Sequence, residues 1–218
     1  FVSSEYNIHV ISLVGSPNEQ ILDNSQIWNS IAISRDKNRL AVTTVLLNPE
    51  LYIIDISGPA PVAKTFPVST PTYTENEVPN TAKFVNAMEF SLDDETLLFD
   101  TYNEITIGGF VYGFWDINVM DVWDVGADTY GSGLNTRIFP QDPTMNLGNP
   151  TFAKTKPSVI AFDAQFPLLG TAYVMAVDVF NGEPKTVYQL PSNTVGFPNY
   201  SGNDGLLSFV VQDQGIDV

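Results

Sequence analysis

The sequence predicts an all-β fold made of repeated antiparallel strands, and three observations support this. Apolar residues make up 44% of the 218 residues, and 14 Phe and 9 Tyr stand among many Val and Ile, a composition that favours strands. Fifteen glycines and 15 prolines fit a chain with many turns. No segment shows a convincing apolar period of 3.6 residues, so we expect no helix of consequence.

One pattern recurs four times along the chain. It consists of an apolar strand, a polar turn and a second apolar strand. We align the copies at the end of the first strand, on Ser34, Ser91, Lys154 and Ser201. The steps between these positions are 57, 63 and 47 residues. Four-stranded repeats usually recur at roughly 40–50 residues, so two of the units are expected to carry insertions.

Further strands are expected after each pair. Clear third strands lie at 51–56, 117–122 and 173–179, and short fourth strands are predicted at 63–67, 136–139 and 186–190. Asp, Asn and Gly stand between the apolar runs, where hairpins need them. Four antiparallel strands per repeat form the blade of a β-propeller, so this is the predicted architecture.

The chain is predicted to be a single propeller domain with about four blades' worth of four-stranded antiparallel sheet. We place whole blades at about 27–83, 84–146 and 147–194, and half blades at 1–26 and 195–218. Two arrangements fit: the halves pair to close a small four-bladed ring, or the chain is part of a larger ring. We favour the larger ring, because the small one needs two matching open edges. Such edges also permit self-association between copies.

Two turns and two strands follow a known family pattern. They are Ser34–Val42, Ser91–Phe99, Tyr52-Ile-Ile-Asp55 and Asn118-Val-Met-Asp121. They resemble the TolB-type, WD40-like propeller repeat, which has Phe-Ser-Pro-Asp-Gly, an apolar strand and a strand that ends in Asp. The turn proline is missing everywhere, and only Asp204-Gly205 keeps the Asp-Gly pair. The resemblance implies an extracellular or periplasmic protein. Propellers of this kind bind partners, cap serine peptidases or act on sugars, so no single activity follows.

Charge and composition exclude several classes of function. The chain has 25 acidic and 9 basic residues, a net charge of −16, which argues against nucleic-acid binding and against adhesion to anionic membranes. With no cysteine, it has neither disulfides nor thiolate chemistry. No apolar run approaches about 18 residues, so no membrane insertion is predicted.

No catalytic residues are predicted. His9 is the only histidine, it lies in an apolar strand, and no Gly-x-Ser-x-Gly motif accompanies it, so a structural or surface role is favoured. With 25 acidic residues, carboxylate pairs arise by coincidence, and nothing singles out an acid and a base. We therefore lean towards a protein that is not an enzyme and that has no cofactor, with calcium as the one possible exception.

The glycine-rich loop that follows the third strand of the second blade is the candidate calcium site. Asp124 and Asp128 are the candidate ligands, because carboxylates and loop carbonyls suit Ca²⁺. The spacing matches no EF-hand loop, and a solvated turn is the competing and favoured interpretation. A calcium-stabilised structural protein is accordingly a third hypothesis.

Aromatic residues around the insertion of the second blade are the candidate contact site for a partner. Tyr112, Phe114 and Trp115 lie there beside flexible glycines, and Tyr73 lies in the long proline-rich segment 58–83. The competing interpretation is that these rings fill space between blades. We expect a non-catalytic, exported propeller whose enlarged loops bind a protein or a glycan on one face. The alternative is an accessory propeller that filters substrate for a larger hydrolase, such as a serine peptidase.

Overall fold

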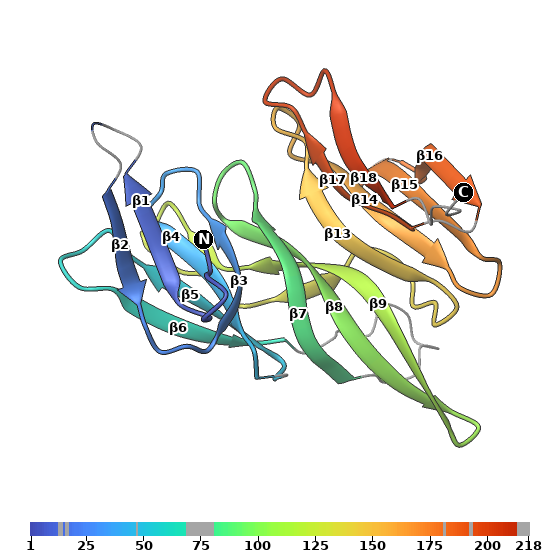
Figure 1. The fold of residues 1–218 in the computed structure, drawn as a ribbon, viewed down its shortest axis with the longest axis horizontal. Helices are drawn as coiled ribbons and strands as arrows, with labels where there is room; N and C mark the ends of the chain where they lie inside the picture. The colour runs from blue at the N-terminus through green and yellow to red at the C-terminus, as the bar shows by residue number, and fades with distance from the viewer. Residues whose placement is uncertain are drawn as a thin grey trace, which may run out of the picture.

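The structure, a computed structural model, describes residues 1–12, 15, 18–46, 48–68, 81–180, 182–191 and 194–212. These residues contain strands and turns but no helix, and so no helix long and apolar enough to cross a membrane. Three four-stranded antiparallel sheets form the body of the molecule (Figure 1), and each sheet follows the order of the chain from its first strand outwards. The all-β propeller fold predicted from the repeats is confirmed.

Sheets 1, 2 and 3 are named in chain order. Sheet 1 contains β3 (Trp28–Ile33), β4 (Arg39–Thr44), β5 (Glu50–Asp55) and β6 (Val62–Pro67). Sheet 2 contains β7 (Thr81–Phe90), β8 (Thr96–Ile107), β9 (Phe110–Asp121) and β12 (Asn135–Arg137), with a small hairpin of β10 (Trp123–Asp124) and β11 (Thr129–Tyr130) before its last strand. Sheet 3 contains β13 (Asn146–Phe152), β14 (Val159–Phe166), β15 (Thr171–Asp178) and β16 (Lys185–Pro191).

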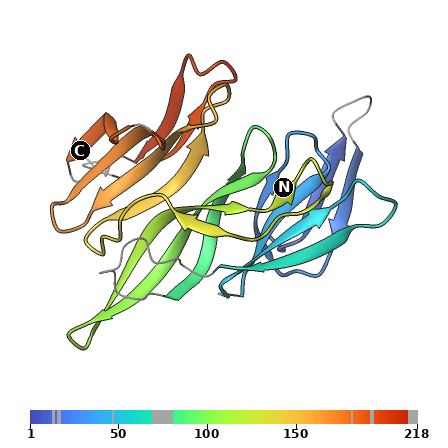
Figure 2. The ribbon, with the colours of Figure 1, turned by 180° about the vertical axis from the view of Figure 1, so that it is seen from behind.

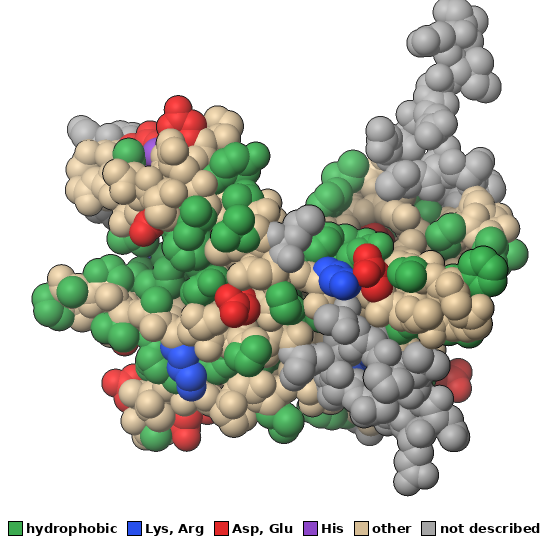
Figure 3. Space-filling view, turned by 90° about the horizontal axis from the view of Figure 1, so that it is seen from below, with side chains coloured by type: hydrophobic (Ala, Val, Ile, Leu, Met, Phe, Trp, Pro, Cys, Tyr) green, Lys and Arg blue, Asp and Glu red, His purple; other side chains and the backbone are tan. Residues whose placement is uncertain are grey.

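Two-stranded sheets flank this body. One pairs β1 (Ile8–Ser12) with β2 (Asn18–Asp23), and the other pairs β17 (Thr194–Tyr200) with β18 (Leu207–Gln212). Among the described strands these two pairs do not join each other, and they lie at opposite ends of the molecule (Figures 1 and 2). Figure 3 shows the notch between the two ends. The described sheets therefore form an open arc and not a small four-bladed ring.

Sheet 2 lies in the middle of the arc and is buried on both faces. Leu97 and Phe99 of β8 join the core shared with sheet 1, where Leu51 and Ile53 pack. Leu98, between them in the sequence, belongs to the core shared with sheet 3. Because successive side chains of a strand point to opposite faces, a continuous apolar run suits a strand that has a sheet on each side.

The turn between the first and second strand of each sheet fixes the register of the repeat. The amide of Ser34 donates to the carbonyl of Arg39, and the amides of Ser91 and Ser201 donate five residues ahead in the same way. In sheet 3 the equivalent donor is Ala153, which bonds to Val159. The alignment on Lys154 was therefore wrong by one residue, because this turn contains one residue more than the others.

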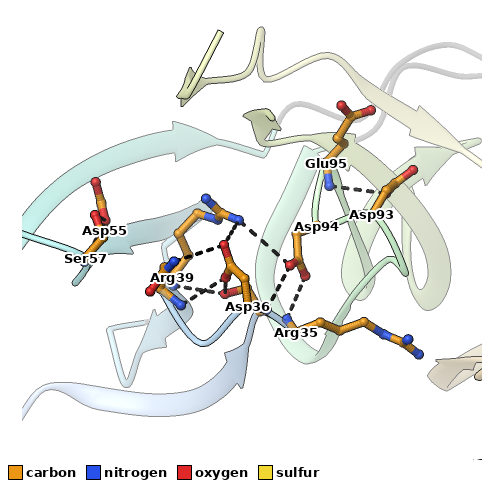
Figure 4. A network of polar contacts seen from close by, with 10 residues as sticks. Arg35, Asp36, Arg39, Asp55, Ser57, Asp93, Asp94 and Glu95 are labelled. Carbon is orange, nitrogen blue, oxygen red and sulfur yellow. Dashed lines mark hydrogen bonds and ion pairs between the residues drawn. The ribbon is translucent and has the colours of Figure 1, made fainter. Parts of the chain in front are cut away.

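These turns also clamp neighbouring sheets together (Figure 4). The carboxylate of Asp94, in the turn of sheet 2, accepts from the amides of Arg35 (2.7 Å) and Asp36 (3.1 Å) in the turn of sheet 1. In the same way, the carboxylate of Asp204 accepts from the amides of Lys154 (2.5 Å) and Thr155 (2.8 Å) in the turn of sheet 3. Asp94 and Asp204 both lie three residues after the serine that begins the turn, so two copies of the repeat supply the clamp from the same position.

Candidate functional site

The hairpin of β8 and β9 is the most prominent feature of the described surface. Each strand has 12 residues, against 6 in the corresponding strands of sheet 1, and the hairpin projects beyond the other strands (Figures 1 and 2). The strands pair without interruption from Thr96 and Asp121 to Ile107 and Phe110. Gly108 and Gly109 form the tip with φ angles of 60° and 86°, the left-handed backbone of a two-residue hairpin turn.

The tip of this hairpin is apolar and exposed. Phe110 and Val111 are 70% and 65% exposed, and Ile107 and Tyr112 are each 43% exposed. The ten residues 105–114 carry no charge, although the chain has 34 charged residues. Monomeric surfaces rarely gather large apolar side chains in this way, and such patches mark contacts with other molecules.

The structure separates the aromatic residues that the sequence grouped together. Tyr112 lies near the tip, but Phe114 is only 1% exposed, so its ring belongs to the core and is not available to a partner. Trp115 follows on the opposite face of β9, half-buried at the base of the hairpin. Tyr73 lies outside the described residues.

At the hairpin base, Trp115 is held by two other rings. Its ring centroid lies 5.4 Å from that of Phe84 and 5.5 Å from that of Tyr102. The backbone of β9 makes room for this cluster at Gly113, where a Cβ atom would lie 2.1 Å from the Tyr102 hydroxyl. Because Gly113 has no side chain, the Tyr102 side chain can lie across strand β9. Its ring and that of Phe84 hold the Trp115 ring in place by packing.

Other turns at the same end of the sheets are also apolar. The lower face is the face of Figure 1 that carries the β4–β5, β8–β9 and β14–β15 turns. In these turns Leu46 is 62% exposed, Leu168 85% and Leu169 72%. Figure 3 looks onto this face and shows hydrophobic side chains spread over it, with few charged ones. The opposite, upper face carries the charged turns that clamp the sheets.

A cavity of about 220 Å³ lies between sheets 2 and 3, close to the hairpin base. Amide and carboxylate side chains line most of it, together with the Trp115 ring. The lining residues are Asn86, Asp100, Trp115, Asn146, Leu147, Gly148, Asn149, Asp163, Gln165 and Phe197. The cavity therefore places the aromatic residue Trp115 beside many hydrogen-bonding groups, and it is more polar than the predominantly apolar pockets that usually bind small molecules.

Two buried aspartates stand at equivalent positions of the repeat in this cavity. Asp100 of β8 and Asp163 of β14 are 2% and 4% exposed. Asp100 accepts from the amides of Ala87 (2.7 Å) and Asn149 (2.8 Å). Asp163 accepts from the Asn149 side chain (2.8 Å) and from the amide of Phe197. Asn149 thus bridges both carboxylates.

Burial dominates the electrostatics of this pair. Loss of hydration raises the pKa of Asp100 to about 7, and the neighbouring charge of Asp163 adds to this, against hydrogen bonds from backbone amides. Burial also raises the pKa of Asp163. Two desolvated carboxylates without a cationic neighbour favour the proton, or another cation, in the cavity.

Sequence reasoning did not identify Asp100 or Asp163. The signal was present: each follows a Phe, in Leu98-Phe-Asp100 and Ala161-Phe-Asp163, four residues beyond the residue that closes the turn. Aligning the second strands of the repeats, rather than searching for clusters along the chain, selects this pair.

The predicted calcium ligands lie elsewhere, in the β10–β11 turn. Asp124 accepts from the amide of Ala127 at 2.8 Å, and Asp128 adopts a left-handed backbone with φ 52°. Within the described part of the chain, no group of three or more His, Asp or Glu side chains is placed to hold a metal ion. The calcium site stays a prediction. His9 is distant in the sequence from the predicted calcium ligands, and its Nδ1 atom lies 2.7 Å from Oε1 of Glu19.

No protein-family model and no curated protein matches the chain. Solved structures do. TolB from Acinetobacter baumannii is 15% identical, with a TM-score of 0.52 over 96% of this chain and 52% of that one. A periplasmic gluconolactonase of Pseudomonas aeruginosa is 11% identical, with a TM-score of 0.44 over 94% of this chain and 71% of that one.

A putative dipeptidyl aminopeptidase IV from Bacteroides ovatus is 13% identical, with a TM-score of 0.42 over 90% of this chain and 29% of that one. At such identities the likeness concerns the fold alone. This chain spans about half the length of the TolB structure that it matches. The resemblance read from the repeats is confirmed at that level: the chain has the β-propeller fold of TolB.

Proposed function

We propose that this chain is a non-catalytic binding propeller that docks a partner protein on its lower face, with the β8–β9 hairpin as the main contact. The observation that carries the proposal is the exposed, uncharged hairpin tip. Phe110, Val111 and Tyr112 stand together there, beyond the edge of the neighbouring sheets.

The energetics favour burial of this tip by a partner. Fully burying a Phe or Val side chain contributes about 1.5–3 kcal/mol relative to leaving it exposed. Phe110 and Val111 are each about two-thirds exposed, so most of this free energy is still to be gained. A paired hairpin is also already ordered, which reduces the entropy lost on binding.

The chemistry of the tip suits a protein better than a glycan. Between Ile105 and Phe114 the hairpin offers two hydroxyl groups, from Thr106 and Tyr112, and no carboxylate or amide side chain. Sugar rings need such groups around an aromatic platform, whereas protein hot spots are apolar and aromatic. The net charge of −16 favours a partner whose rim is basic.

An extracellular or periplasmic location is part of the proposal, and it rests on the TolB-type repeat. Fractionation of cells that express the tagged full-length gene product tests it. A protein found only in the cytoplasmic fraction contradicts this part of the proposal.

Site-specific photocrosslinking tests the docking face. The matched positions are Phe110 on the lower face and Phe180, which is 80% exposed in the β15–β16 turn at the opposite end of sheet 3. With benzoyl-phenylalanine at each position in turn, in the source cells, we expect a discrete protein adduct from position 110 only. Equal adducts from both positions, or none from position 110, contradict the proposal, and a carbohydrate adduct shows that the partner is a glycan.

A further inference from the structure

The cavity between sheets 2 and 3 contains a point at which both buried carboxylates converge. A methyl group at Gly148 would lie 3.5 Å from Asp100 Oδ2 and 3.5 Å from Asp163 Oδ2, so the two oxygens are at most about 7 Å apart. Gly148 is not among the glycines with a left-handed backbone. Its missing side chain leaves space beside two carboxylates, at the β-bulge that interrupts the pairing of β13 with β14.

The two carboxyl groups at this point have no cationic side chain beside them in the cavity. No Lys, Arg or His is found among the described residues that line it. Both carboxylates are bonded only to neutral donors, the backbone amides and the Asn149 side chain. Each carboxylate oxygen has two lone pairs and can accept a further hydrogen bond. A cationic group placed between them would remove much of the unfavourable energy of two buried charges.

The acceptors on the cavity wall select the kind of cation. Gly148 has no side chain to fill the space in front of the two carboxylates, and a primary ammonium group placed in that space has three N–H donors. Two of these N–H groups can donate hydrogen bonds to the two aspartates, one to each. A third acceptor is available on the cavity wall, since Asn149 Oδ1 is buried without a partner among the described atoms.

The rest of the cavity suits an alkyl chain. The Trp115 ring lines it, and aromatic faces attract both apolar stems and cations. We propose that this cavity binds a primary alkylammonium group, with its nitrogen between Asp100 and Asp163 and its carbon chain against Trp115. The group comes from a free amine or from a lysine side chain, and the site is separate from the hairpin tip.

Calorimetric titration of the folded chain tests this proposal. The probe is n-butylammonium chloride, and n-butanol is the uncharged control of similar shape. We expect binding of the ammonium and none of the alcohol. Gly148→Ala fills the point of convergence without changing charge, and Asp163→Asn removes one carboxylate. Each is expected to weaken binding at least about tenfold, because the methyl group of Gly148→Ala keeps the ammonium away from the two carboxylates and Asp163→Asn removes a charge-assisted hydrogen bond.

The matched control is Gly126→Ala. Its added methyl would lie 3.4 Å from an Asp124 oxygen, also beside a carboxylate but in an exposed turn, and it is expected to leave binding unchanged. Nα-acetyl-lysine methylamide shows whether a lysine side chain enters the site as well as a free amine does. No binding of butylammonium, equal binding of butanol, or unaltered binding by Gly148→Ala overturns the proposal. So does tighter, Gly148-dependent binding of Ca²⁺.

Discussion

The clamp between sheets 1 and 2 allows a quantitative prediction. Asp94 is 5% exposed and accepts two amide hydrogen bonds from the turn of sheet 1, from Arg35 and Asp36. One of its oxygens also lies 3.8 Å from the buried guanidinium of Arg39 (Figure 4). Asp94→Ala removes all three contacts while leaving the strands intact, so it measures how strongly the turns hold neighbouring sheets together.

The magnitude follows from these contacts. An amide that loses its acceptor costs about 1–3 kcal/mol when water cannot reach it. Because Arg35 and Asp36 are exposed residues, we take the lower end of this range, about 1 kcal/mol, for the amide of each. Arg39 keeps its closer partner, Asp36 at 2.6 Å, and its contribution is therefore small. The expected loss is about 2–3 kcal/mol, a large share of the roughly 5–15 kcal/mol that stabilises a typical domain.

Urea unfolding at neutral pH is the assay, and Lys37→Ala is the control. Lys37 occupies the same place in the turn of sheet 1 and has nearly the same left-handed backbone, φ 64° against 62° for Asp94. Its side chain is exposed, so the control carries the backbone strain of alanine without loss of a clamp. If the two variants lose stability equally, the turns do not clamp the sheets and this reasoning is refuted.

Two further predictions concern the cavity and the hairpin base. Because burial raises the pKa values of Asp100 (to about 7) and Asp163, the folded state favours their protonated forms. The contribution of Asp100 to stability is complete below about pH 4 and is lost as the pH rises through about 7, so the unfolding free energy should fall by about 3 kcal/mol from pH 5 to 8. Asp100→Asn should make this pH dependence shallower in urea titrations, and an unchanged pH dependence in this variant contradicts the assignment. Gly113→Ala would place a methyl group 2.1 Å from the Tyr102 hydroxyl, so it should cost about 1–3 kcal/mol and alter the near-ultraviolet circular dichroism. An unchanged spectrum and stability would show that Tyr102 is not held across Gly113.

The fold was predictable because its signals are local. Apolar runs, polar turns and strands that end in Asp repeat along the chain, and each blade strand arises from its own stretch of sequence. The register was less predictable in sheet 3. There the turn after Ala153 has an extra residue, and the position of Lys154 resembled that of the serines only in the linear sequence.

The hairpin site was predictable only in part, since alternation does not show how far a strand extends beyond its neighbours. Phe110, Tyr112 and Phe114 lie on one face of β9, yet their exposed fractions fall from 70% to 43% to 1% towards the body. The sequence identifies the aromatic segment, and the tertiary structure decides which rings stay outside.

The cavity was hidden for a different reason. Asp100 and Asp163 are 63 residues apart in the sequence and meet only because β13, the first strand of sheet 3, packs against the strands of sheet 2. The space beside them arises because Gly148, on strand β13, has no side chain. No single segment of the sequence contains this combination.

The central claim is that the lower face docks a partner protein through the hairpin tip. The most direct measurement is the affinity of the chain for its purified crosslinked partner, with Phe110→Ser compared with Phe180→Ser. Losing most of the burial of one Phe side chain corresponds to about 1.5–2 kcal/mol, so Phe110→Ser should weaken binding by about 10- to 30-fold. Phe180→Ser should leave it unchanged. Equal affinities for the two variants, or a loss confined to Phe180→Ser, would contradict the account.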